Sequence, residues 1–162
     1  MDIQNLDRPH VLGLGSLPNQ FKIPPHSHEA EQAVLGGLML DNQAWEQIAD
    51  KILAEDFYRP EHQKIYQVMS ILASAQTPLD VITVSEELQK KDYLQEVGGL
   101  SYLGELAKNT PSAANIAAYA EIVRERKVLR ELITIGGDIS EAAFNPEGKA
   151  SSEILDDAER KV

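Results

Sequence analysis

The chain has 162 residues, a length that suits one domain or a small domain with an appendage. Its net charge of -11 repels phosphates, so we do not expect this chain by itself to bind nucleic acid directly. It has no cysteine and no apolar run of about 18 residues, which excludes disulfides, metal sites with thiolate ligands and membrane-spanning helices. These features indicate a cytoplasmic protein.

The first segment, residues 1–22, shows no sustained hydrophobic period and holds two prolines and two glycines. We predict a disordered leader there. Folded structure is expected from residue 23, where Pro24 and Pro25 keep the backbone extended just before a first helix. Ser27 is the expected N-cap of that helix, and Glu29 and Glu31 fall in its first turn.

Further helices are predicted by apolar residues at intervals of three and four. A second helix is expected from Trp45 to Leu53, and a third from Pro60, because proline suits a first helical turn. A capping box formed by Thr83 and Glu86 opens the expected fourth helix. A glycine pair at 98–99 ends the segment that contains the fourth helix. A short fifth helix then completes a globular helical head at residues 23–111.

The second part of the chain, residues 112–162, is expected to form a helical hairpin. A long helix is predicted from about Ala113 to Phe144, and such a helix extends beyond a head of about 90 residues. The turn "NPEGK" then leads to a last helix capped by Ser151 or Ser152. Since a two-helix hairpin has too small a core to be stable alone, we expect it to pack on a second copy.

Two features of the long helix leave alternatives open. The glycine pair at 136–137 costs about 1 kcal/mol per residue relative to alanine, and it indicates close helix approach, a kink or a hinge. The charged block "RERK" at 124–127 is explained by ion pairing on a solvated face. The other interpretation is that it contacts an acidic or polar partner.

A search for catalytic chemistry finds little. The chain has no Walker A, GxSxG or HExxH sequence. His26, His28, Glu29 and Glu31 could in principle hold zinc, but a helix start explains the same residues without a metal, so we predict no metal and no catalytic residue. The last helix runs to Val162 without a capping signal, which favours a fragment of a longer parent.

Three stretches taken together resemble one family. They are "PPHSHEAEQAVLGGLMLDN", "DFYRPEHQKIYQVM" and "VGGLSYLGELAKNTPSAANIAAYAEIVRERKVLREL", and they occur in the family's order and spacing. This pattern is similar to the N-terminal domain of bacterial replicative DNA helicases, the DnaB family. The resemblance covers about residues 23–162 and leaves the leader outside.

The resemblance implies an all-α fold with a small globular head and an antiparallel helical hairpin, here residues 115–143 and 151–162. It implies an N-terminal domain for assembly and partner docking, whose hairpins pair into dimers and into a hexameric trimer-of-dimers collar. The expected partners are a second copy, the C-terminal domain of primase and a helicase loader. The parent is expected to be an ATP-dependent 5′–3′ helicase whose ATP and magnesium bind in a RecA-like C-terminal domain, and this chain to stop before the linker helix.

Apolar period and family architecture together nominate the residues of the hairpin and its dimer surface: Tyr119, Ile122, Val123, Leu129, Ile133, Ile139, Ile154 and Leu155. Core packing is the competing explanation for each of them. Three arginines are weaker candidates for polar contacts with primase or a loader: Arg124, Arg126 and Arg130.

Two rival functions remain at this stage. A free-standing all-α interaction or regulatory module would end near Val162, whereas the helicase hypothesis requires a Walker A sequence further along the same gene. A metal-dependent enzyme using His26 and His28 would retain metal at near-equal stoichiometry after dialysis.

Overall fold

A computed structural model describes residues 22–162, and the predicted leader lies outside this range except for Lys22. Within it the chain forms helices and no strand, which confirms the all-α prediction. The elements are α1 (His28–Leu40), α2 (Ala44–Ile48), the 3₁₀ helix η4 (Ala54–Asp56), α3 (Pro60–Ser74), α4 (Val81–Lys90), α5 (Gly99–Asn109), α6 (Ile116–Phe144) and α7 (Ser151–Lys161).

Local signals place most helix starts. The Ser27 hydroxyl accepts the Ala30 N–H at 3.2 Å at the start of α1, and Pro60 is the first residue of α3, as predicted. The capping box predicted at Thr83 and Glu86 is wrong by one turn. Asp80 caps α4 instead, because its carboxylate accepts the Thr83 N–H at 2.8 Å while the Thr83 hydroxyl accepts the Asp80 N–H at 3.0 Å.

Two other helix limits also differ from the prediction. The second helix ends at Ile48 instead of Leu53, because the Leu53 N–H bonds to the Asp56 carboxylate at 2.8 Å and the chain turns into η4. At α7 neither predicted serine is the cap; Ala150 occupies the N-cap position and no side chain caps it.

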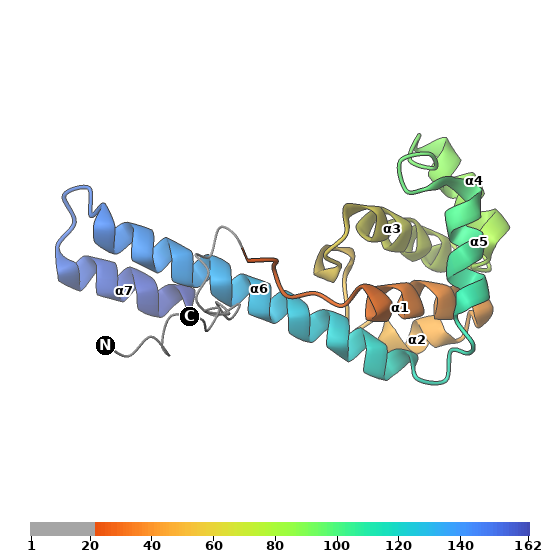
Figure 1. The fold of residues 1–162 in the computed structure, drawn as a ribbon, viewed down its shortest axis with the longest axis horizontal. Helices are drawn as coiled ribbons and strands as arrows, with labels where there is room; N and C mark the ends of the chain where they lie inside the picture. The colour runs from red at the N-terminus through yellow and green to blue at the C-terminus, as the bar shows by residue number, and fades with distance from the viewer. Residues whose placement is uncertain (1–21) are drawn as a thin grey trace, which may run out of the picture.

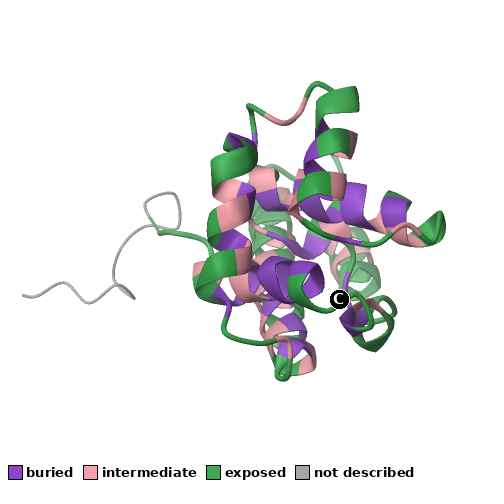
Figure 2. Cartoon of the chain, turned by 90° about the vertical axis from the view of Figure 1, so that its right-hand side faces the viewer, coloured by how far each residue is buried: buried purple, intermediate pink, exposed green. Residues whose placement is uncertain are grey.

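The head consists of α1–α5 together with the first turns of α6, and its helices enclose an aliphatic core. Figure 2 shows the buried residues gathered on the inner sides of these helices. A close contact joins α1 to α5 at Gly36, where a Cβ atom would lie 2.3 Å from the Leu106 carbonyl oxygen and 2.1 Å from Thr110 Oγ1. The core therefore requires glycine at this position.

The arm is the rest of α6 together with α7. Ile116, Ala120 and Val123 of α6 are buried in the head core, and the helix then projects away from the head (Figure 1). After the turn at 145–150, α7 runs back antiparallel beside the distal part of α6. The predicted hairpin is confirmed, and among residues 22–162 no helix is long and apolar enough to cross a membrane.

Candidate interaction site on the helical arm

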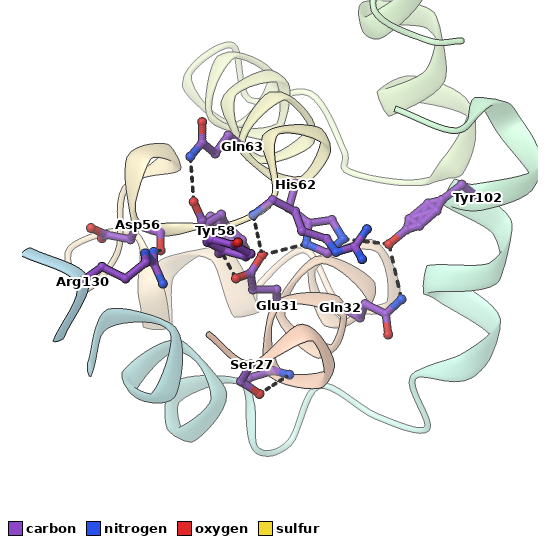
Figure 3. Close-up of polar contacts among 12 residues, drawn as sticks. Ser27, Glu31, Gln32, Asp56, Tyr58, His62, Gln63, Tyr102 and Arg130 are labelled. Atoms are coloured by element: carbon purple, nitrogen blue, oxygen red, sulfur yellow. Dashed lines mark hydrogen bonds and ion pairs between the residues drawn. The ribbon is translucent and has the colours of Figure 1, made fainter. Parts of the chain in front are cut away.

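The arm is attached to the head through a region that a buried polar network stabilises (Figure 3). Glu31 of α1 is 1% exposed and accepts three hydrogen bonds. Its donors are the Tyr58 N–H at 2.9 Å, the Arg59 N–H at 3.3 Å and His62 Nδ1 at 2.8 Å. One carboxylate thus joins α1 to the chain before α3 and to α3 itself.

The network continues from α3 to α5. His62 Nε2 lies 2.7 Å from the Tyr102 hydroxyl, and that hydroxyl accepts a bond from Gln32 Nε2 at 3.3 Å. When Nδ1 carries the ring proton and donates to Glu31, Nε2 accepts from the Tyr102 hydroxyl, and every group in the chain of contacts has a partner of the correct polarity. The arrangement fixes α1, α3 and α5 relative to one another.

Electrostatics keep Glu31 ionised. Burial by itself raises the pKa of this carboxyl, but the hydrogen bonds from His62 and from the Tyr58 and Arg59 N–H groups outweigh it, and the pKa is lowered from its ordinary value. Burial chiefly, with the charge of Arg59 next, lowers the pKa of His28, which stacks on His62 with ring centres 5.5 Å apart. His26 stacks on Tyr58 at 4.2 Å. Nowhere in residues 22–162 do His, Asp and Glu side chains gather as a metal site would require.

Two arginines of α6 hold the arm on this region. Arg124 Nη1 donates to the Asp56 carboxylate at 2.8 Å, and Arg130 donates at 2.8 Å to both the Pro25 and the Asp56 carbonyl oxygens. The Arg130 guanidinium also lies 5.4 Å from the centre of the Tyr58 ring. Arg124 and Arg130, nominated for partner contacts, are therefore engaged within the chain. Arg126 is half-buried, and its side chain makes no hydrogen bond or ion pair with residues 22–162.

The nominated apolar residues fall into three groups. Val123 belongs to the head core, and Tyr119 and Ile122 are half-buried against that core, so these three attach the arm to the head. Ile139 and Ile154 are half-buried in the hairpin. The outward-facing members are Leu129, Ile133 and Leu155.

Two grooves follow the arm. The joint groove has a volume of about 320 Å³ and lies where the extended segment before α1 passes α6; its lining includes Ile23, Pro24, Tyr58, Arg130, Ile133 and Thr134. The tip groove has a volume of about 420 Å³ between α6 and α7; its lining includes Ile139, Ala143, Ile154, Leu155 and Ala158. The tip groove is lined mainly by aliphatic side chains, whereas the joint groove combines apolar and polar side chains. Apolar surface of this kind is typical of protein-binding sites.

Sequence reasoning missed several residues of this site. Leu132 is 52% exposed beside Ile133, and Phe144 is 84% exposed where α6 ends. Asp56 lies in η4, where its buried carboxylate accepts from Arg124 and its carbonyl oxygen accepts from Arg130. These contacts join residues far apart in the sequence and are visible only in three dimensions. His62 is fully buried on α3, where its ring bridges Glu31 and Tyr102.

A sequence profile described as the DnaB-like helicase N terminal domain matches residues 23–125. The chain belongs to this family. Two DnaB-family relatives are the replicative DNA helicases DnaB of Haemophilus influenzae, 48% identical over 155 residues, and of Geobacillus stearothermophilus, 45% identical over 141 residues. The matches cover 96% and 87% of this chain but 33% and 31% of the relatives, so the chain spans about a third of their length.

Solved DnaB structures share the fold. The crystal structure of the N-terminal domain of DnaB helicase from Mycobacterium tuberculosis matches with a TM-score of 0.81 and 36% identity, over 86% of this chain and 97% of that chain. A structure of a DnaB-like replicative helicase, solved to describe its interactions with primase, matches with a TM-score of 0.64 and 27% identity. That match covers 80% of this chain and 31% of the helicase.

Proposed function

We propose that this DnaB N-terminal domain assembles and docks partners for a replicative helicase, and that the outward face of the arm performs both tasks. The observation that carries the proposal is the row of exposed aliphatic residues on α6, where Leu129, Leu132 and Ile133 are 36%, 52% and 51% exposed. Covering exposed aliphatic groups beside a groove with another protein removes apolar surface from water and stabilises the complex.

The first partner is a second copy of the chain. Arms that pair would bury the exposed α6 residues and the tip groove, in which Leu155 of α7 is 60% exposed. In the parent helicase such dimers would assemble into a hexameric collar, as the family resemblance implies. Interfaces of this apolar character are typical of stable homodimers.

The second partner is the C-terminal domain of primase, with a helicase loader as a further candidate. Support comes from the matching helicase structure that was solved for its interactions with primase. The joint groove offers apolar lining from Ile23, Pro24 and Ile133, which suits an apolar side chain of a partner. Arg126 lies on the same helix without a partner among the described residues and is available for a polar contact.

We assign the chemistry of the parent to other parts of it. The chain has no Walker A sequence, so ATP and magnesium would bind in a C-terminal motor domain. On this proposal the parent is an ATP-dependent 5′–3′ helicase in cytoplasmic DNA replication, and the present chain contributes organisation instead of catalysis.

The proposal is tested by binding of the primase C-terminal domain, measured by isothermal titration calorimetry. Ile133→Asp places a charge in the joint groove and is expected to weaken binding at least 10-fold while circular dichroism shows unchanged helical content. Ile82→Asp is the matched control, because Ile82 is 63% exposed on α4 of the head. Equal affinity of the two variants for the primase domain would contradict docking at this surface.

A further inference from the structure

The arm contains a glycine pair that no packing among residues 22–162 requires. Gly136 and Gly137 lie within the continuous helix α6, and a Cβ atom added at either position would meet no atom within 4 Å. This contrasts with Gly36, where close approach excludes any side chain. Each glycine makes local opening of the helix about 5-fold more favourable than alanine would.

The part of α6 before this pair is held by the head. Val123 is buried in the core, and Arg130 bonds to the carbonyl oxygens of Pro25 and Asp56. Arg130 makes the last of these bonds along α6. From Ile116 to Arg130 the helix therefore moves with the head.

The part of α6 after the pair is held by α7. The Asp138 carboxylate lies 4.0 Å from Lys161 Nζ, and Ile139 shares the tip groove with Ile154 and Leu155. From Asp138 onward the helix therefore moves with the hairpin. Between the two held parts lies the stretch 131–137, which contains the glycine pair.

A second local feature weakens the same turn. The Thr134 hydroxyl donates to the Arg130 carbonyl oxygen at 3.2 Å, which is the contact to the residue four positions earlier that bends helices. Sharp bends in helices occur at such small-residue pairs. We infer that Gly136–Gly137 is a hinge in the arm, about which the tip groove moves relative to the joint groove and the head.

The hinge is a property of one chain and does not depend on the proposed partners. It has a functional consequence, because a surface divided by a hinge can meet its partners at more than one angle. Identical subunits in different positions of an assembly could then keep their tip contacts while the heads take different orientations.

The test replaces both glycines with alanine in the full 162-residue chain and compares it with Gly104→Ala. Gly104 is a matched control, since it lies within α5 and a Cβ atom there also meets nothing within 4 Å. Hydrogen exchange of the amides at 134–140 is expected to slow about 5-fold for each alanine, and the Gly104 variant is expected to leave it unchanged.

A distance measurement completes the test. The chain has no cysteine, so spin labels at Lys91→Cys on the head and Glu159→Cys on α7, both exposed, report on the angle. The double alanine variant is expected to narrow the distance distribution at the same oligomeric state. Unchanged width and exchange would overturn the hinge. Unchanged exchange with self-association weakened at least 10-fold would also overturn it, because the glycines would then serve close approach of a second copy.

Discussion

Asp56 offers the sharpest test of how the arm is fixed to the head. Its side chain is 1% exposed and takes two hydrogen bonds, one from the Leu53 N–H and one from Arg124 Nη1, each at 2.8 Å. A hydrogen bond to a buried carboxylate contributes about 1.5–3 kcal/mol. The pair with Arg124 contributes less than about 1 kcal/mol, because the arginine side chain is 48% exposed.

We therefore expect Asp56→Ala to lower the free energy of unfolding by about 3 kcal/mol, measured by urea denaturation with far-ultraviolet circular dichroism. Asp56→Asn is the control, because its amide oxygen still accepts the Leu53 N–H, and it should cost about 1 kcal/mol or less. The reasoning is refuted if Asp56→Ala remains within about 1 kcal/mol of the unmodified chain, or if the asparagine costs as much as the alanine.

Two further predictions concern the head. Folding lowers the pKa of Glu31 from 4.5, so the unfolded chain takes up a proton first and the free energy of unfolding falls as pH drops below about 4.5. Glu31→Gln should reduce this pH dependence, measured by urea denaturation at a series of pH values. The same pH dependence in the variant would contradict the role given to Glu31. Gly36→Ala should lower the free energy of unfolding by more than about 3 kcal/mol, because its Cβ would overlap the Leu106 carbonyl oxygen. Gly104→Ala should raise it by up to about 1 kcal/mol. Equal shifts of the melting temperature in the two variants would exclude the close contact at Gly36.

The sequence predicts those parts of the fold that depend on neighbouring residues. The cap at Ser27 and the start of α3 at Pro60 involve contacts within one turn, and both are confirmed. The second helix was extended too far because its apolar spacing continues to Leu53, whereas Asp56 captures the Leu53 N–H and turns the chain. The spacing of apolar residues does not show that a side-chain acceptor competes with the helix for a backbone N–H.

The site was harder to predict because one apolar stripe runs through two environments. Val123 and Ile133 share the helical spacing of α6, yet Val123 is 1% exposed in the head core and Ile133 is 51% exposed on the arm. The arginines of α6 were equally hard to tell apart from the sequence. Arg130 bonds to Pro25, 105 residues away, and no local pattern distinguishes it from Arg126 on the same helix.

The central claim, association through the arm, is tested most directly by the molar mass of the chain in solution. Light scattering across a dilution series should give twice the 17.9 kDa of one chain for the unmodified protein at high concentration. Ile133→Asp should give the mass of a monomer, and Ile82→Asp should match the unmodified protein. A monomer at every concentration, or identical masses for all three proteins, would contradict the account.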